Sequence, residues 1–206
     1  AYLDGKTPCL IVERGTYNTI KVVAYEYRGG KLHELWSWND RESGARYRGQ
    51  GAHILRAADV DGDGRDEVIL GSAVLDDDGT GLWSTGLGHP DNLTVGDLDP
   101  ERPGLEIQYG IETRNPKNSI CMVDAKTGKI LWGLQEPSTH IHGSGLCADI
   151  DPRYPGVESY QGEADFKEKR WLYNAKGEVI DTRDLGGLAP RAAYWDADLQ
   201  REIVTG

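Results

Sequence analysis

Long apolar runs are missing from this sequence of 206 residues, and no stretch approaches the roughly 18–20 apolar residues that a membrane-spanning helix needs. A basic segment followed by an apolar one, typical of a secretory leader, is also missing at the N-terminus. We therefore expect a soluble protein without a membrane partner.

Positive charge is scarce. The 23 Lys and Arg residues stand against 34 Asp and Glu residues, giving a formal net charge of −11. An acidic surface repels a phosphate backbone, so nucleic acid is not an expected partner. Cations are.

Cysteine is rare and odd in number, with only Cys9, Cys121 and Cys147. Each lies in a run that is typical of a β-strand, which favours buried free thiols over a disulfide framework. This pattern leaves the redox compartment open.

Glycine is abundant, at 27 residues, and Trp and Tyr together number 16, while Phe and Met occur once each. This composition is typical of short strands joined by tight turns. We therefore predict an all-β fold.

The most informative motif runs from Asp59 to Glu67, where acidic residues alternate with glycines. Ca²⁺ takes six to eight oxygen ligands at about 2.3–2.6 Å, and one short loop offers that many. The predicted ligands are Asp59, Asp61, Asp63, the carbonyl of Arg65, and Glu67. An EF-hand is excluded because β-rich runs, 52–58 and 68–74, flank the loop in place of helices. A surface turn without an ion is the alternative.

Weaker copies of this motif follow along the chain. The leading aspartates Asp59, Asp97, Asp149 and Asp196 stand 38, 52 and 47 residues apart. These spacings match the roughly 40–50 residues of a four-stranded propeller blade. The further predicted metal ligands are Asp97, Asp99 and Glu106, then Asp149, Asp151 and Glu158, with Asp196, Asp198 and Glu202 in the same frame.

The predicted fold is thus a β-propeller of four-stranded antiparallel blades with calcium-binding loops. At about 45 residues a blade, residues 1–206 supply roughly four to five blades, so we expect a partial propeller domain, a fragment of a catalytic domain whose last residues, 202–206, lie within a strand. Strand–Gly–strand–Trp segments, such as those ending at Trp36 and Trp132, predict outer hairpins whose tryptophans pack between blades.

The repeat frame also predicts a site on the face opposite the acidic loops. His53 and Asp91 each stand six residues before the leading aspartate of their unit, His89 stands two before Asp91, and Glu112 ends the next antiparallel strand. Two imidazoles and two carboxylates on one face suit a metal with open positions. Imidazole by itself favours a transition metal over calcium.

Other residues have two interpretations. His140 and His142 lie near the same face, where they either contact substrate or are exposed loop residues. The run Asp76 to Gly81 predicts a hairpin turn first and an additional cation site second.

Several segments resemble rhamnogalacturonan lyases of polysaccharide lyase family eleven over essentially the whole chain. They are 49–53, the Asp59 loop, 76–82, 84–89, 96–100 and 148–156. The resemblance implies an eight-bladed propeller with several structural calcium ions, secreted by microbes, that cuts the rhamnogalacturonan-I backbone of pectin. We therefore expect a secreted, periplasmic or cell-surface protein. It also implies that His53, His89, Asp91 and Glu112 hold an active-site calcium. The chain departs from the family pattern at Thr94 and Ile111, where histidine is expected, and at Ser144, where arginine is expected.

Such a site would catalyse β-elimination at a uronate, with a divalent cation on the carboxylate and a base taking the C5 proton. His53 and His89 are the candidate bases where they are not committed to metal, and a group outside this chain is the alternative. We expect an acidic plant cell-wall polysaccharide as substrate and a monomer. Two other functions stay open: a non-catalytic, calcium-stabilised propeller that binds glycans or proteins, and a metal-dependent hydrolase.

Overall fold

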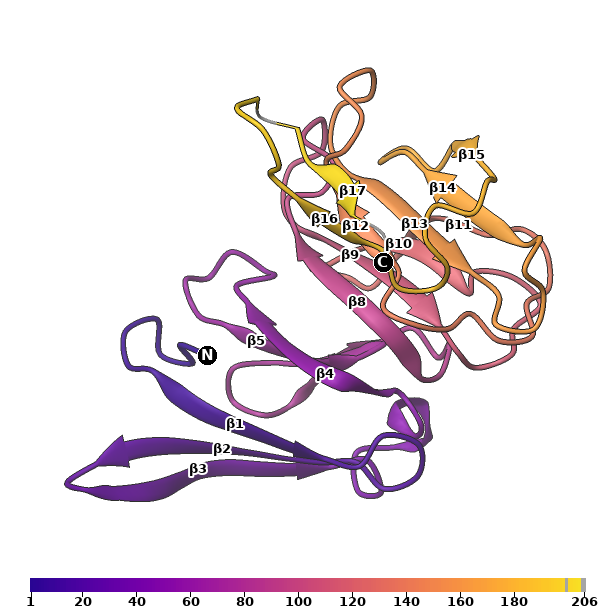
Figure 1. Ribbon diagram of the computed structural model, residues 1–206. Helices are drawn as coiled ribbons and strands as arrows, with labels where there is room; N and C mark the ends of the chain where they lie inside the picture. The colour runs from indigo at the N-terminus through magenta and orange to yellow at the C-terminus, as the bar shows by residue number, and fades with distance from the viewer. Residues whose placement is uncertain (199, 205–206) are drawn as a thin grey trace. The chain divides into compact units, whose positions relative to one another are not determined.

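The computed structural model describes residues 1–198 and 200–204 and is built from antiparallel strands, with one short 3₁₀ helix, η1 (Ala45–Tyr47) (Figure 1). The strands are β1 (Cys9–Arg14), β2 (Lys21–Arg28), β3 (Lys31–Asn39), β4 (Gly51–Ala58), β5 (Glu67–Gly71), β6 (Ala73–Leu75), β7 (Gly81–Ser84), β8 (Pro90–Gly96), β9 (Glu106–Ile111), β10 (Ile120–Asp124), β11 (Ile130–Gly133), β12 (Leu146–Ala148), β13 (Glu158–Gly162), β14 (Arg170–Tyr173), β15 (Val179–Asp181), β16 (Arg191–Ala193) and β17 (Glu202–Val204). The described residues contain no helix with the length and apolar character needed to span a membrane.

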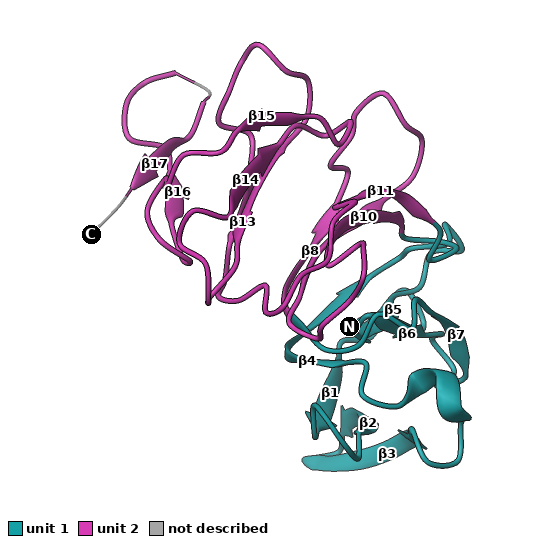
Figure 2. Ribbon diagram, turned by 90° about the vertical axis from the view of Figure 1, so that its right-hand side faces the viewer, with its two compact units in different colours: residues 1–90, 125–129 teal, residues 91–124, 130–206 magenta. Residues whose placement is uncertain are grey.

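The chain divides into two compact units, residues 1–90 with 125–129 and residues 91–124 with 130–206 (Figure 2). The first unit holds the sheets β1-β2-β3 and β4-β5-β6-β7. The second holds β8-β9-β10-β11, β12-β13-β14-β15 and the pair β16-β17. Neighbours in each sheet are consecutive in the chain, so every sheet is an antiparallel meander. The predictions of an all-β class and of four-stranded antiparallel sheets are therefore confirmed.

Burial follows position within each sheet. Strands β5, β9 and β13, each second in its four-stranded sheet, are buried along their whole length. Strand β1 instead alternates half-buried and exposed residues, as expected for a strand with one face toward solvent. The core of the first unit comprises Leu3, Ile20, Val22, Ala24, Trp38, Tyr47, Val68, Leu70, Ala73 and Leu75. In the second unit, one cluster is centred on Ile120, Ile141 and Tyr173, and another on Tyr160 and Leu172.

Tryptophans join successive sheets by one repeated contact. The indole Nε1 of Trp36 donates to the carbonyl of Asp77, that of Trp83 to Ala125, and that of Trp132 to Ala175, at 2.8, 2.9 and 2.9 Å. Each acceptor lies in the hairpin turn of the following sheet. This confirms the prediction that the tryptophans of these hairpins pack between sheets.

A glycine lies against each of these indole rings. Gly79, Gly128 and Gly177 have φ of +82°, +69° and +84°, and a Cβ at any of them would collide with the ring of Trp36, Trp83 or Trp132. The glycine thus serves both the turn and the close approach of the indole. The hairpin pattern in the sequence therefore encodes contact between sheets as well as the turn itself.

Three predictions about local structure need refinement. The apolar run 68–74 is not one strand: β5 ends at Gly71 and β6 begins at Ala73, because the buried hydroxyl of Ser72 bonds to Gln50 and to the carbonyl of Gly88 and the chain bends there. All three cysteines are free and lie in strands, but only Cys121 is fully buried. Strand β17 ends at Val204, and the rest of the predicted terminal strand, 205–206, lies outside the described residues.

Candidate metal centres

The first acidic loop joins β4 to β5 and wraps around Asp59. One carboxylate oxygen of Asp59 accepts the N–H groups of Gly62 and Asp63 at 2.8 and 3.1 Å, and the other accepts Gly64 N–H at 3.0 Å. Ligand oxygens of Asp59, Asp61 and Glu67 lie within 4.8 Å of one another. Three of the predicted ligands are thus brought together by a loop of nine residues.

Glu67 is the buried member of this group. Its Oε2 accepts the N–H of Val60 at 2.7 Å, whereas its Oε1 is buried without a hydrogen-bond partner. Burial raises the pKa of Glu67 to about 7, and neighbouring carboxylates add to the effect. A buried carboxylate with an unpartnered oxygen, grouped with two other acidic side chains, fits a bound cation, which would stabilise all three charges.

Asp63 is turned away from the group. Its Oδ1 accepts the N–H of Arg65 at 2.9 Å, and its other oxygen faces the Arg65 guanidinium at 3.9 Å. The Arg65 guanidinium also pairs with Asp77 at 2.9 Å. The predicted ligand role of Asp63 therefore has less geometric support than those of Asp59 and Asp61.

The run Asp76 to Gly81 forms the hairpin turn between β6 and β7, as predicted. Asp76 N–H donates to the Thr80 carbonyl at 2.8 Å, and Gly79 N–H donates to the Asp76 carbonyl at 2.9 Å. Oxygens of Asp76 and Asp77 also come within 4.8 Å of Glu67, and burial raises the pKa of Asp76. This supports the second interpretation of the run, a cation site, in which Glu67 would be a ligand shared with the first acidic loop.

The last residues of the first three copies of the motif have the same structural role. Glu106 Oε2 accepts the N–H groups of Leu98 and Asp99, at 3.0 and 3.2 Å. Glu158 Oε2 binds the corresponding positions, Ile150 and Asp151, at 2.9 Å, whereas Glu202 accepts the N–H of Trp195, the residue before Asp196, at 3.0 Å. Sequence analysis assigned these glutamates to metal alone and missed that one oxygen of each holds the loop closed.

The second and third copies face cationic side chains of the protein. Lys176 Nζ lies 2.8 and 2.9 Å from the two oxygens of Asp99, and Arg102 Nε lies 3.5 Å from Glu106 Oε1. In the third copy, the Arg153 guanidinium binds both oxygens of Asp151 and lowers the pKa of that carboxyl.

Within residues 1–198 and 200–204, neither the second nor the third copy forms a group of three ligand atoms within 4.8 Å, whereas Asp196, Asp198 and Glu202 of the fourth copy do. Glu158 of the third copy nevertheless keeps a buried Oε1 without a hydrogen-bond partner. The metal-ligand roles of Asp97 and Asp149 stay predictions.

The two predicted site histidines of the first unit are neighbours. The rings of His53 and His89 lie edge to face with centroids 4.8 Å apart. His89 is buried, and its Nδ1 lies 2.5 Å from the carbonyl oxygen of Gly51. Because a carbonyl only accepts, Nδ1 carries the proton, so neutral His89 has its lone pair on Nε2.

Tyr17 is a member of this cluster that sequence analysis missed. Its hydroxyl lies 3.4 Å from Nε2 of His53, and its ring centroid lies 4.5 Å from that of His89. Gly15 at φ +91° turns the chain just before Tyr17, and a Cβ there would collide with the Thr19 carbonyl. The segment Gly15 to Tyr17 between β1 and β2 was a detectable turn signal, but nothing in its spacing pointed to His53.

A cavity of about 280 Å³ lies beside this cluster in the first unit. Its lining comprises Ile11, Glu13, Gly15, Thr16, Ala52, His53 and Leu55. Glu13 Oε1 is buried without a hydrogen-bond partner, and burial raises the pKa of Glu13 to about 8. The alternating burial of β1, which places Glu13 on the same side as Ile11, was the signal that could have found it.

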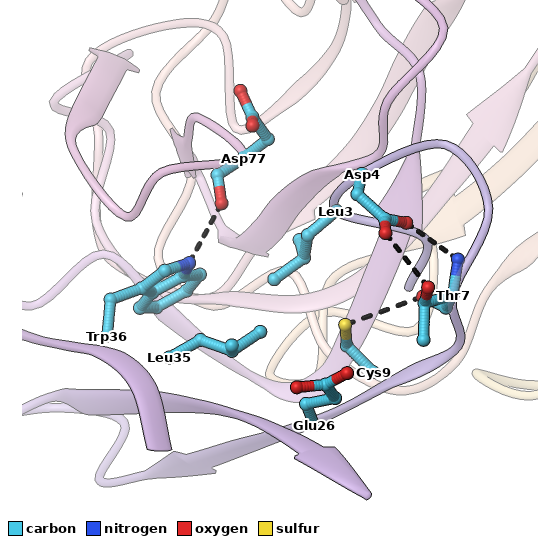
Figure 3. A pocket seen from close by; sticks show the side chains of 8 residues that line it. All are labelled: Leu3, Asp4, Thr7, Cys9, Glu26, Leu35, Trp36 and Asp77. Atoms are coloured by element: carbon cyan, nitrogen blue, oxygen red, sulfur yellow. Dashed lines mark hydrogen bonds between the residues drawn. The ribbon is translucent and has the colours of Figure 1, made fainter. Parts of the chain in front are cut away.

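A second cavity of the first unit, about 260 Å³, lies near the N-terminus (Figure 3). It is lined by Leu3, Asp4, Thr7, Cys9, Glu26, Leu35, Trp36 and Asp77. Hydrogen bonds within the turn from Asp4 to Thr7 lower the pKa of Asp4 to about 2. The polar groups drawn here bond mainly to one another, as in the Trp36–Asp77 contact between sheets.

In the second unit, Asp91 and Glu112 each face a histidine. His142 Nδ1 lies 2.5 Å from Asp91 Oδ2, and His140 Nε2 lies 3.2 Å from Glu112 Oε1. The predicted four-residue site thus takes His53 and His89 from one unit and Asp91 and Glu112 from the other. The structure brings His53 and His89 together. Convergence of all four on one ion stays a prediction.

The three positions that depart from the family pattern have structural roles in the second unit. Ile111 is fully buried, Thr94 bonds to the Cys147 thiol, and the Ser144 hydroxyl accepts from Arg191 at 2.6 Å. An arginine side chain therefore reaches position 144 from β16.

The whole chain, residues 1–206, matches the family model described as rhamnogalacturonan lyase family 11, C-terminal domain. The chain is 48% identical to rhamnogalacturonan endolyase YesW of Bacillus subtilis (strain 168), covering 98% of this chain and 31% of YesW. It is 44% identical to rhamnogalacturonan exolyase YesX of the same strain, covering 99% of this chain and 33% of YesX. It therefore spans about a third of the length of these curated relatives.

Solved structures agree in fold. The crystal structure of the exotype rhamnogalacturonan lyase YesX superposes with a TM-score of 0.88 at 42% identity, covering 98% of this chain and 34% of YesX. A Bacillus licheniformis rhamnogalacturonan lyase superposes with a TM-score of 0.83 at 44% identity, covering 99% of this chain and 33% of that enzyme.

Proposed function

Because this chain belongs to rhamnogalacturonan lyase family 11, whose C-terminal domain it matches from end to end, we propose that it is part of a polysaccharide lyase that cleaves the rhamnogalacturonan-I backbone of pectin by β-elimination. The observation that carries the proposal is the match over residues 1–206 together with 44–48% identity to an endolyase and an exolyase. Both relatives act on rhamnogalacturonan by name, which supports the substrate class and leaves endo or exo action open.

The proposed architecture is a β-propeller in which each four-stranded meander is a blade. Three observations support it: consecutive antiparallel strands in every sheet, an acidic loop after the first strand of successive sheets, and the tryptophan contact repeated between sheets. The first loop is the proposed structural calcium site. Its fit rests on Glu67, which has a buried Oε1 without a hydrogen-bond partner and lies in one group of ligand atoms with Asp59 and Asp61.

The proposed catalytic centre combines His53 and His89 with Asp91 and Glu112, and calcium is the proposed ion. When bound there, a divalent cation would stabilise the negative charge that develops on the uronate carboxylate. His89 is held by the Gly51 carbonyl, which presents its Nε2 in one fixed tautomer. Holding the ring in this way is typical of a metal ligand.

Proton transfer falls to groups beside that centre. A base takes the C5 proton, the C4–C5 double bond forms as the C4–O bond breaks, and the departing oxygen takes a proton. The Tyr17 hydroxyl, 3.4 Å from His53 Nε2, gives this chain a proton-transfer pair of its own. This supports a base within the chain alongside the alternative of a group outside it.

The charge of the protein bears on its partners and location. A chain of net charge −11 repels an acidic polysaccharide, so cations at the site would offset that repulsion. A polymer of the plant cell wall is too large to enter a cell, which supports secretion or attachment to the cell surface. We propose that the protein acts as a monomer.

The test uses the full natural polypeptide that contains this chain. Incubation with rhamnogalacturonan I and calcium should raise ultraviolet absorbance as unsaturated products form, and a chelator should stop the increase. Cleavage that yields reducing ends without unsaturation would instead identify a hydrolase. Binding without any cleavage would identify a non-catalytic glycan-binding propeller, and either result would reject the proposed activity.

A further inference from the structure

Two histidines and a carboxylate of the second unit form a cluster that the proposed lyase site does not use as a set. His140 Nε2 lies 3.1 Å from His142 Nδ1 and 3.2 Å from Glu112 Oε1. The ligand atoms of these three residues all lie within 4.8 Å of one another. We propose that Glu112, His140 and His142 bind a divalent transition metal of the zinc class.

The backbone holds the two histidines in place before any ion arrives. Ile141 between them is fully buried and bridges Glu163, so the side chains on either side of it share the opposite face. His140 N–H donates to the buried carboxylate of Glu163 at 2.8 Å, and Gly143 N–H donates to Asp91 at 2.9 Å. The segment is therefore pinned at both ends.

Glu112 is placed by an equally rigid neighbour. It follows the last residue of β9, Ile111, which is fully buried and whose N–H donates to the Ser119 carbonyl at 2.7 Å. Successive side chains of a strand point to opposite faces, so Glu112 lies on the side opposite Ile111. The three ligands thus come from two segments anchored by buried isoleucines.

Each of the two facing imidazole nitrogens lies next to a second imidazole and a carboxylate. His140 Nε2 faces both His142 Nδ1 and a Glu112 oxygen, while His142 Nδ1 faces both His140 Nε2 and Asp91 Oδ2. Imidazole nitrogens and carboxylate oxygens gathered in this way are the donors that bind a divalent cation of the zinc class.

Spacing and donor type favour the zinc class over calcium. Tetrahedral bonds of about 2.0–2.1 Å place ligand atoms about 3.3 Å apart, close to the observed 3.1 and 3.2 Å. Imidazole suits zinc, cobalt, nickel and copper, whereas calcium prefers oxygen ligands. The side chains of His140 and His142 are 33% and 47% exposed, so the ion would keep a position open to solvent.

Asp91 lies beside this site. Its carboxylate lies 2.5 Å from His142 Nδ1 and also accepts the Gly143 N–H, so it fixes the turn after His142 and adds negative charge next to the ion. The inference does not depend on lyase activity, although Asp91 and Glu112 also belong to the proposed catalytic centre.

The test measures Zn²⁺ binding by calorimetry and Co²⁺ binding by visible absorption, both with and without calcium, because calcium fills the oxygen-rich loops and also competes for Glu112 in the proposed catalytic centre. The double variant His140→Gln/His142→Gln should lose this binding and its tetrahedral Co²⁺ spectrum. Asp91→Asn removes the negative charge next to the ion and should weaken binding. The matched control His33→Gln removes an exposed histidine of β3 that bonds to the Arg28 carbonyl, and it should bind as the unmodified protein does.

Two results would overturn the proposal: unchanged Zn²⁺ affinity in the His140/His142 variant, or loss of binding in a His53→Gln variant instead. Glutamine keeps polar contacts at partly exposed positions, and circular dichroism checks that the variants fold. If lyase activity is absent while Zn²⁺ binding follows His140 and His142, the metal site stands and only the proposed function fails.

Discussion

Lys176 places its ammonium nitrogen 2.8 and 2.9 Å from the two carboxylate oxygens of Asp99, whose side chain is only 3% exposed. Lys176 lies in the turn before β15, so one sheet of the second unit supplies the cation for the acidic loop of another. In the first loop the equivalent lysine, Lys126 in the turn before β11, donates instead to the backbone carbonyl of Asp61 at 2.8 Å. Loops with one sequence pattern thus receive the same lysine on different oxygen atoms.

Replacing Lys176 by Met should make the second loop depend on calcium. The buried Asp99 carboxylate would lose its partner, so the variant should unfold at a lower temperature than the unmodified protein in chelator. Added calcium should restore more of the melting temperature in the variant than in the unmodified protein, as measured by differential scanning calorimetry. Lys129→Met, at an exposed turn position, is the control. An equal response to calcium in both variants would contradict this account.

Asp61→Asn should weaken calcium binding at the first loop far more than Asp63→Asn does. Asp61 belongs to the group with Asp59 and Glu67, whereas Asp63 pairs with Arg65. An ion at 100 times its dissociation constant stabilises the folded state by about 2.7 kcal/mol, most of which Asp61→Asn should remove. Urea unfolding with calcium and with chelator measures the difference. Equal losses in the two variants would mean that Asp63 is a ligand after all.

Features encoded within one repeat could be predicted from the sequence, and features that join repeats could not. The Asp59 loop, the Asp76 turn and the tryptophan hairpins each follow from a short pattern and its period. Lys176 meets Asp99 across 77 positions of sequence, and Tyr17 meets His53 across 36. No periodicity marks such pairs, because they depend on which sheets lie side by side.

The same distinction explains the errors about individual side chains. Glutamates at the end of each motif were assigned to metal because carboxylates suit calcium, but loop closure also requires them, through backbone N–H groups that no sequence pattern displays. His140 and His142 were left between substrate contact and exposed loop. Only the buried Ile141 between them shows why both rings point the same way.

Glu13 should make the protein less stable as pH rises. Burial raises its pKa from 4.5 to about 8, so the folded state favours the neutral acid. Its contribution to the free energy of unfolding is therefore full below pH 4.5, declines as pH rises toward 8, and is flat above that. Glu13→Gln removes this decline. At pH 9 the free energy of unfolding of the variant should therefore be higher than that of the unmodified protein by roughly 2–4 kcal/mol.

Chemical denaturation at pH 5 and pH 9 in saturating calcium measures this effect, because the loaded acidic loops then contribute little pH dependence of their own. Glu34→Gln, at an exposed position of β3, is the control and should leave the pH dependence unchanged. If Glu13→Gln keeps the same loss of stability between the two pH values, the carboxyl is ionised in the folded protein at pH 5.

Substitution of His53 should lower activity alone, whereas substitution of His89 should also lower stability. His89 is buried and donates to the Gly51 carbonyl, so His89→Ala leaves a cavity and an unsatisfied carbonyl and should destabilise the fold by about 1–3 kcal/mol. His53 is exposed, so His53→Ala should change stability by less than about 0.5 kcal/mol while lowering lyase activity at least about 100-fold. Unfolding curves and the unsaturated-product assay measure the two effects. An active His53→Ala enzyme would remove His53 from the site.

Tyr17→Phe tests whether this chain supplies a proton-transfer group. The phenyl ring preserves the packing against His89, whose centroid lies 4.5 Å from that of Tyr17, and only the hydroxyl beside His53 is lost. Removing a general acid or base typically costs 10²–10⁴-fold in rate, so kcat should fall by about that factor with little change in KM, and the alkaline limb of the pH–rate profile should move. A purely structural role for Tyr17 predicts a loss of stability with an unchanged pH profile. That outcome would remove Tyr17 from proton transfer and leave His53, His89 or a group outside this chain as the base.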